Sequence, residues 1–335
     1  MSKHIRILGA GPAGLTTAIV LAKNGERVAV YDRRPGVGYR FNDDFQGLEN
    51  WSVEKNVIAE LTEMGLTIDF FCKPFRGGRI YNPKLIPLEV SSPYPLFYLV
   101  KRGRSVDTLD RVLERQALEA GVELHYNQIL SPHDVDVVAT GPRGTRAIAA
   151  GITFETNRLD YAYGTVGDEL APQGYTYLLI ADGKATLATV LFSDFPKASI
   201  CLDKAIKTYQ KLLDLNIVNP RYWGGYGNFN VPQTAVEEGR LYIGEAAGFQ
   251  DMLFGFGIRT AMISGYLAAQ SILLQTNYDK LWKSRFLPML KASQANRLLY
   301  AHLGKIAYYF LWHMIGRNRR PDKFMRWLYS WRQYL

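Results

Sequence analysis

The chain has 335 residues, of which 47% are hydrophobic and 21% are charged. These values are typical of a globular protein of roughly two domains with a full hydrophobic core. Cys72 and Cys201 share no short spacing, which excludes a disulfide framework and a cysteine-based zinc site. The net charge is +9, but the basic residues lie outside any recognisable nucleic-acid-binding module, so we expect neither a metal nor a nucleic acid.

Residues 4–32 show the pattern of a strand, a glycine-rich turn, a helix and a second strand. The turn places Gly9, Gly11 and Gly14 at the spacing G-x-G-x-x-G. In a dinucleotide-binding fold the first glycine makes the turn, the second admits a pyrophosphate and the third lets the helix pack closely on the strand. Asp32 stands 18 residues after Gly14, where a carboxylate can bond a ribose hydroxyl. The segment predicts a dinucleotide site; the alternative is a glycine-rich turn in some other α/β protein.

The candidate cofactor-binding residues of this segment belong to the turn and to the end of the second strand: Gly9, Ala10, Gly11, Pro12, Ala13, Gly14, Asp32 and Arg33. Arg33 and Arg34 suit the 2′-phosphate of NADP, but Asp32 would repel that phosphate if it held the ribose. We therefore expect an adenosine without the extra phosphate, which leaves NAD and FAD open.

Residues 37–51, "VGYRFNDDFQGLENW", form the most polar stretch between the predicted elements. Such a segment either orients a substrate or redox partner or serves as a helix-capping surface loop, because loops often carry function but most polar side chains are simply solvated. Both interpretations stay open from the sequence. The polar residues concerned are Arg40, Asp43, Asp44, Gln46, Glu49 and Asn50.

Two further elements belong to the same nucleotide-binding sheet. Residues 108–126 predict an amphipathic helix that Gly121 ends, followed by a strand. Residues 135–144 predict a buried parallel strand that ends at Thr140 and Gly141.

Residues 76–100 and 151–234 are rich in tyrosine and in alternating patterns such as "GYTYLLIADGKATLATVLF". Alternation of this kind predicts an antiparallel sheet with one covered face. Five aromatic residues there could line an apolar pocket or belong to the core: Tyr161, Tyr163, Tyr175, Tyr177 and Trp223.

Residues 240–261 repeat the order of strand, glycine, acid and helix start. A strand from Leu241 to Ile243 leads to Gly244 and Glu245, and a helix begins near Gly257. A nicotinamide cofactor needs one such platform, whereas FAD is long enough to need a second, with an acid for its ribityl hydroxyls and a helix N-terminus facing its flavin ring. The two platforms together favour FAD.

Four stretches in order, "GAGPAG", "VYDRRPGVG", "VVATGP" and "GEAAGFQDMLFGFGIRTA", resemble the FAD-dependent oxidoreductases of the geranylgeranyl reductase family, which have the para-hydroxybenzoate hydroxylase type of fold. The resemblance covers most of residues 1–285. It implies that the first glycine turn holds the pyrophosphate, Asp32 the adenosine ribose, Glu245 the ribityl chain, and the backbone of Gly257 and Ile258 the flavin ring. Glu245 stands where the family usually has aspartate.

The resemblance also implies an arginine close before the second helix of the cofactor domain. In "KRGRSVDTLD" the spacing differs from the family's, so Arg102 or Arg104 takes that role only if extra residues bulge out, and Arg102 is the candidate carried forward. At residues 175–180, "YTYLLI" stands where lipid-reducing members carry Y-x-W-x-F-P, so only the two aromatic positions remain.

The expected fold is α/β (α+β), with a Rossmann-type FAD-binding domain, an inserted antiparallel substrate domain and a helical C-terminus. The expected boundaries are 1–75, 101–150 and 235–285 for the FAD-binding domain, 76–100 and 151–234 for the substrate domain, and 286–335 for the C-terminal segment.

The expected activity is that of an FAD-dependent oxidoreductase acting on an apolar, isoprenoid or lipid-like substrate. The alternatives are an FAD-dependent monooxygenase, because fold does not fix function, and a non-catalytic flavoprotein that docks to a membrane or partner. The flavin carries the electron chemistry, so no catalytic side chain is named. No second G-x-G-x-x-G is visible, and the electron donor is either NADPH or a redox protein.

The last twenty residues hold more than half of the net charge. We expect the aromatic side chains there to pack on the body and the cations to be solvated; the alternative is peripheral contact with an anionic membrane. The expected location is cytoplasmic, with the inner membrane surface as the place of that contact. The residues are Arg317, Arg319, Arg320, Lys323, Arg326 and Arg332, interleaved with Phe324, Trp327, Tyr329, Trp331 and Tyr334.

Overall fold

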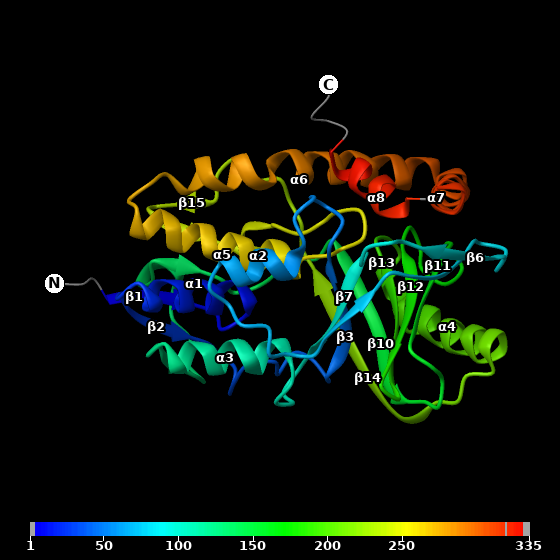
Figure 1. Ribbon diagram of the computed structural model, residues 1–335, viewed down its shortest axis with the longest axis horizontal. Coiled ribbons are helices and arrows are strands. Elements are labelled where there is room, and N and C mark those ends of the chain that lie inside the picture. The colour runs from blue at the N-terminus through cyan, green and yellow to red at the C-terminus, as the bar shows by residue number, and fades with distance from the viewer. Residues whose placement is uncertain (1–3, 319, 331–335) are drawn as a thin grey trace.

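The computed structural model of the chain describes residues 4–318 and 320–330. The predicted α/β architecture is confirmed. A six-stranded sheet with its helices forms one end of the molecule, a seven-stranded sheet forms the other, and a long helix runs along both (Figure 1). The division into domains at the expected boundaries stays a prediction, and strand β10 begins at Ala147, a few residues before one of them.

The six-stranded sheet is the predicted nucleotide-binding sheet. Its strands are parallel except β15, and their order is β15 (Val236–Glu237), β16 (Arg240–Tyr242), β9 (Val137–Val138), β1 (His4–Leu8), β2 (Arg27–Tyr31) and β8 (Glu123–His125). The first glycine turn and the second strand–acid–helix segment therefore reach the same carboxyl edge of one sheet, where α/β folds bind their ligands.

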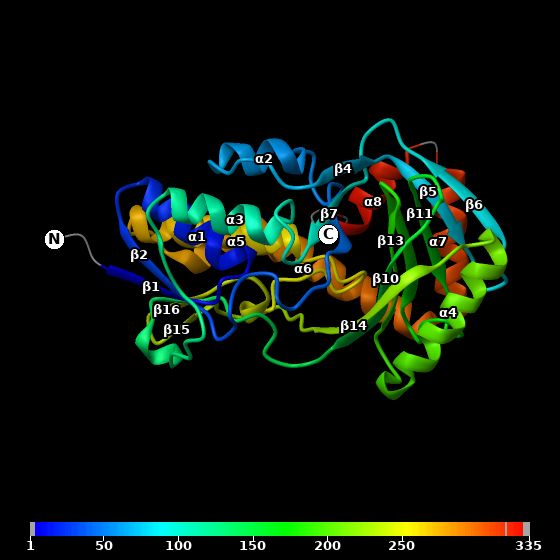
Figure 2. The same ribbon diagram turned by 90° about the horizontal axis from the view of Figure 1, so that it is seen from below.

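The seven-stranded sheet is mainly antiparallel, as the alternating patterns predict, with one parallel pair between β11 and β5. Its order is β14 (Val218–Gly227), β10 (Ala147–Glu155), β13 (Lys184–Leu191), β12 (Tyr175–Ala181), β11 (Tyr161–Val166), β5 (Gly77–Tyr81) and β6 (Pro87–Ser91). A smaller sheet of β3 (Asp44–Glu49), β7 (Phe97–Arg102) and β4 (Cys72–Phe75) lies between the two large ones (Figure 2).

Helices cover both large sheets. The helices of the cofactor end are α1 (Pro12–Lys23), α2 (Val57–Glu63), α3 (Leu109–Glu119) and α5 (Ile258–Leu273). Helix α4 (Ala198–Leu213) packs on the seven-stranded sheet, and α6 (Tyr278–Leu303), α7 (Lys305–Arg317) and α8 (Pro321–Ser330) form the C-terminal segment. Short 3-10 turns are η1 (Pro132–Asp134), η2 (Phe195–Lys197) and η3 (Gly244–Ala247).

Helices α1 and α5 carry the two ends of the cofactor platform, and they cross in direct contact. A Cβ on Gly265 would lie 2.3 Å from the carbonyl oxygen of Ala13, so only glycine allows this approach. The hydroxyl of Thr17 donates to the carbonyl oxygen of Gly265 at 3.0 Å. This crossing fixes the distance between the two helix N-termini that face the cavity described below.

The C-terminal helices pack on the body. Phe324 and Tyr329 of α8 are buried, whereas Trp327 is half exposed. The packing that we expected is therefore confirmed for two of these aromatic residues. Arg319, Trp331, Arg332 and Tyr334 lie outside the described residues.

Candidate functional site

One cavity of about 840 Å³ extends from the glycine turn to the inner face of the seven-stranded sheet. This volume lies within the roughly 300–1,000 Å³ that is usual for cofactor and ligand pockets. Of the fifteen residues proposed from the sequence, Gly14 and Gly244 do not line the cavity, and the other thirteen do: Gly9, Ala10, Gly11, Pro12, Ala13, Asp32, Arg33, Arg102, Thr140, Gly141, Glu245, Gly257 and Ile258.

The glycine turn presents backbone to the cavity. A Cβ on Gly14 would lie 2.0 Å from the carbonyl oxygen of Gly9, and a Cβ on Gly9 would lie 2.3 Å from that of Ala139. These two glycines hold the turn against the helix and the neighbouring strand. A Cβ on Gly11, in contrast, would meet nothing within 4 Å, because it points into open space at the N-terminus of α1. The first turn of that helix, Pro12 to Leu15, contains no acidic residue, so its positive end suits a phosphate.

Asp32 joins the turn to the end of β2. Its Oδ2 accepts the N–H of Ala10 at 2.8 Å, and its Oδ1 accepts the N–H of Arg34 at 2.9 Å. A carboxylate has about four lone-pair positions, so both oxygens keep acceptor capacity for a ribose hydroxyl on the cavity side.

Arg102 lies in the cavity wall and pairs with Asp110. Its Nε and Nη2 donate to the two carboxylate oxygens at 2.9 and 2.8 Å, and both side chains are buried. Residues 103–108 bulge out between the two partners, and Asp43 holds this bulge by accepting the N–H groups of Arg104 and Ser105. The guanidinium also lies 4.2 Å from the centre of the Phe41 ring.

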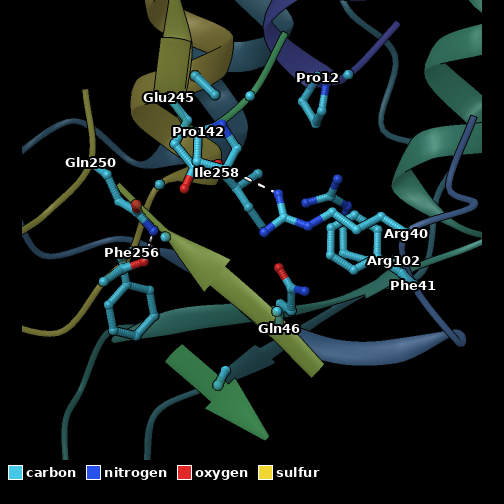
Figure 3. Close-up of a pocket in the computed structure, with 18 of the residues that line it drawn as sticks. Pro12, Arg40, Phe41, Gln46, Arg102, Pro142, Glu245, Gln250, Phe256 and Ile258 are labelled. Carbon is cyan, nitrogen blue, oxygen red and sulfur yellow. Dashed lines mark hydrogen bonds and ion pairs between the residues drawn. The ribbon is translucent and has the colours of Figure 1, made fainter. Parts of the chain in front are cut away.

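Arg40 lies across the cavity between Phe41 and Glu245 (Figure 3). Its Nη1 lies 3.6 Å from Oε2 of Glu245, and its Nη2 donates to the carbonyl oxygen of Tyr226. Burial raises the pKa of Glu245 above its ordinary value, while Arg40 and the N–H of Asn228 act in the opposite direction. Arg40, Tyr226 and Glu245 are far apart in the sequence. The two contacts of Arg40 are therefore visible only in the fold.

The N-terminus of α5 forms the other end of the platform. Gly257 is its N-cap residue and, like Ile258, lines the cavity. Gln250 lies beside it and donates from Nε2 to the carbonyl oxygen of Gly255 at 2.6 Å, while its buried Oε1 has no hydrogen-bond partner. Among the described residues this acceptor is unpartnered, and because an unpartnered buried acceptor is costly, it suits a hydrogen-bond donor of a bound ligand.

The seven-stranded sheet supplies one wall of the cavity, in which glycine and alanine alternate with aromatic and aliphatic side chains. Gly78, Ala162 and Gly164 lie on this wall, and a Cβ on Gly164 would meet nothing within 4 Å. Tyr163, Tyr175, Tyr177 and Trp223 also line the cavity, whereas Tyr161 instead donates from its hydroxyl to Glu89. Burial raises the pKa of Tyr175 and of Tyr177 above the ordinary tyrosine value, so both stay neutral at physiological pH.

The polar segment of residues 37–51 divides between the two interpretations. Arg40 and Gln46 line the cavity. Asp44, Glu49 and Asn50 instead bond within the protein. Asn50 accepts the N–H of Val57, the first residue of α2, whereas the N-cap of that helix is Asn56. The expectation of a loop throughout is wrong for Asp44–Glu49, which is strand β3, because pairing with β7 satisfies its backbone.

A buried ion network holds the first turn of α5 from behind the cavity. Arg259, which is 1% exposed, donates from Nε and Nη2 to Oε2 of Glu60 at 2.9 and 2.6 Å. Arg285 donates to Oε1 of the same carboxylate at 2.6 Å. Burial raises the pKa of Glu60, but the two guanidinium groups outweigh it and hold the pKa below its ordinary value.

We expect Glu60→Gln to lower the free energy of unfolding by about 3 kcal/mol at neutral pH, because it leaves buried Arg259 without a full countercharge. A carboxylate with a lowered pKa stabilises the fold above its ordinary pKa, and this contribution is lost as the pH falls through the folded-state value. Urea denaturation of the wild type and Glu60→Gln should therefore give a difference in the free energy of unfolding that becomes smaller at acidic pH. An equal difference at neutral and acidic pH would contradict this account.

The residues of the cavity fit FAD. The open space beside Gly11, the carboxylate of Asp32 and the free Oε1 of Gln250 match the phosphates, the ribose hydroxyls and the N–H of the flavin pyrimidine edge in turn. Gly11 is the N-cap of α1, Asp32 follows β2, and Gln250 lies beside the N-terminus of α5, so the groups span both platforms, which a shorter cofactor would not need.

Known proteins are similar to this chain over most of its length. Residues 7–53 match the model of an NAD(P)-binding Rossmann-like domain. The chain is 32% identical over 316 residues to the digeranylgeranylglycerophospholipid reductase of Methanosphaerula palustris, which covers 79% of this chain and 75% of that protein. It is 22% identical over 340 residues to the protein of that name from Methanosarcina acetivorans, covering 83% and 80%.

A solved structure shares the fold along its length. The geranylgeranyl bacteriochlorophyll reductase-like protein of Thermoplasma acidophilum superposes with a TM-score of 0.76 at 18% sequence identity, over 99% of this chain and 98% of that one.

Proposed function

Since this chain belongs to the geranylgeranyl reductase family of FAD-dependent oxidoreductases, we propose that it reduces carbon–carbon double bonds in an apolar isoprenoid or lipid chain. The observation that supports this proposal best is the continuity of the cavity. The same space that reaches the glycine turn and the start of α5 continues along the inner face of the seven-stranded sheet.

Bound FAD would supply the electron pair for such a reduction. The protein's own residues hold the cofactor at Gly11, Asp32, Glu245 and the N-terminus of α5, and they shape the space beside it. Aliphatic and aromatic side chains make up much of the sheet wall, so it favours an apolar chain.

The electron donor is proposed to be NADPH or a redox protein. The protein is proposed to work in the cytoplasm, with a peripheral contact to the membrane through its basic C-terminal region. The sequence charge supports that contact. No helix within residues 4–318 and 320–330 has the length and apolar character needed to cross a membrane.

The proposed activity is tested by incubating the chemically reduced holoprotein with a polyprenyl lipid under anaerobic conditions and analysing the lipid by mass spectrometry. Gain of two hydrogen atoms per reacted double bond supports the proposal. Gain of an oxygen atom on admission of air, with oxygen consumed in step with the lipid, would indicate a monooxygenase instead.

Gly164 should limit the length of the chain that the cavity accepts. It lies in β11 with open space in front of it, so Gly164→Leu should leave folding and FAD binding unchanged and fill the path along the wall. For Gly164→Leu, we expect the ratio of kcat/KM for a long chain to kcat/KM for a short chain to fall about tenfold or more below the wild-type ratio. Gly164→Ala is the matched control and should have a much smaller effect. An equal loss for long and short chains would show that Gly164 does not set length.

A further inference from the structure

The corner between α6 and α7 exposes large apolar side chains. Leu298, Leu299, Leu303, Ile306 and Phe310, here called the apolar strip, are each between 43% and 70% exposed. Leu299 and Leu303 stand four residues apart on α6, and Ile306 and Phe310 stand four apart on α7, so each pair lies on one face of its helix. Side chains of this size are exposed together where a surface meets a partner or a membrane.

The corner has a defined shape. Helix α6 ends at Leu303 and α7 begins at Lys305, and Gly304 between them has φ +50° and ψ −121°. Few residues other than glycine adopt that conformation, so the turn that brings the two halves of the apolar strip together depends on it. The corner lies at the end of the molecule that carries the seven-stranded sheet (Figure 1).

The C-terminal helices that carry the apolar strip are rich in cations, and two acids of other segments contact these helices, Asp168 at the hydroxyl of Tyr308 and Glu54 at Arg326. Residues 286–330 contain eight lysines and arginines and a single acid, Asp322. That acid is buried and pairs with Arg320. Lys291, Lys305 and Arg317 are exposed on α6 and α7. Apolar side chains with cations around them fit the surface of an anionic bilayer, where the chains enter the headgroup region and the cations meet lipid phosphates.

The inner faces of the same helices pack against the wall of the cavity. Tyr308 and Leu311 of α7 and Leu328 of α8 are buried in one apolar cluster. Seven other residues of that cluster also line the cavity: Ile80, Val90, Leu96, Phe97, Tyr175, Phe254 and Phe256. Only one layer of helices therefore separates the apolar strip from the apolar end of the cavity.

We propose that the α6–α7 corner is a docking surface for an anionic lipid bilayer. This proposal rests on the exposure of the apolar strip and on the charge of the helices that carry it, and not on the function proposed above. The aromatic residues of α8 are not the main contact, because Phe324 and Tyr329 are turned into the body.

Docking is tested with the full-length holoprotein and sedimented vesicles, in the absence of substrate and reductant. Vesicles that contain phosphatidylglycerol should bind the protein, and pure phosphatidylcholine vesicles should bind it much less. The double variant Ile306→Asp with Phe310→Asp should lower partitioning about tenfold or more, because it places carboxylates where apolar side chains enter. A second double variant, Lys305→Glu with Arg317→Glu, should lower it by about fivefold or more for each cation lost.

The matched control is Tyr222→Asp, which changes an equally exposed aromatic residue on β14, away from the corner. It should bind like the wild type, and all variants should keep the flavin absorption of a folded holoprotein. The proposal would be overturned if the wild type failed to bind the anionic vesicles. It would also be overturned if both corner variants bound these vesicles as well as the wild type does. A wild-type dimer in solution that Ile306→Asp with Phe310→Asp converts to a monomer would overturn it as well, because the apolar strip would then be covered by a second copy. None of these results depends on turnover, so docking can fail while the proposed reaction stands.

Discussion

Replacing Gly11 by alanine is expected to raise the Kd for FAD at least about thirtyfold while leaving the stability of the apoprotein within about 0.5 kcal/mol of the wild type. The φ of Gly11 is −83°, which alanine adopts without strain, and its added Cβ would touch no protein atom within 4 Å. The methyl group would instead occupy the space through which the backbone N–H groups of the turn reach a phosphate. Loss of two such charge-assisted hydrogen bonds accounts for the expected weakening.

Gly14→Ala is the contrasting variant in the same turn. Its Cβ would lie 2.0 Å from the carbonyl oxygen of Gly9, so the helix cannot keep its place against the strand. We expect a loss of about 1–3 kcal/mol or more in the free energy of unfolding, before any cofactor is added. Fluorescence titration with FAD and urea denaturation of the apoprotein separate the two effects. A Gly11→Ala variant that binds FAD like the wild type would show that the phosphates do not lie at this turn.

Arg102→Ala should be the most destabilising single change in the cavity wall. It would leave the carboxylate of Asp110, which is 3% exposed, with the N–H of Gly103 as its remaining recorded donor. Removing one partner of a buried, bidentate ion pair typically costs about 3–5 kcal/mol. The change would also remove the cation above Phe41, on the side of the cavity that faces the cofactor.

Arg115→Ala on the same helix as Asp110 is the matched control. Its ion pair with Asp69 is about half exposed on both sides, so its loss should cost about 1 kcal/mol or less. Urea denaturation of the two apoproteins at neutral pH makes the comparison. Equal stability of the two variants would mean that the buried Arg102–Asp110 pair contributes no more to folding than the exposed Arg115–Asp69 pair.

The sequence predicts many of the residues that line the cavity because the rules that place them are local. The three glycines, the acid at the end of β2 and the start of α5 each follow from spacing within a short segment, and the cavity gathers thirteen of the fifteen proposed residues. Gly14 and Gly244 do not line the cavity and instead support the residues that do. The first lets the helix approach the strand, and the second donates its N–H to the hydroxyl of Ser264 at 2.8 Å.

The features that the sequence does not predict depend on contacts between distant segments. Arg40 meets Glu245 and Tyr226 only because the loop before β3 lies against the end of β14. Gly164 matters because the sheet faces the cofactor end, and no local pattern marks it among the glycines. The exposed apolar strip likewise arises from the turn at Gly304, which no periodicity of the C-terminal segment indicates.

FAD is expected to bind in this cavity, at the glycine turn and the N-terminus of α5. The most direct measurement is the visible absorption spectrum of the purified protein after incubation with FAD and removal of free flavin, recorded anaerobically before and after addition of NADPH or a reducing protein. We expect a bound flavin spectrum in the wild type that bleaches with one of these donors, and a strongly reduced flavin content in Gly11→Ala. A folded wild-type protein that stays colourless after incubation with FAD would contradict this expectation.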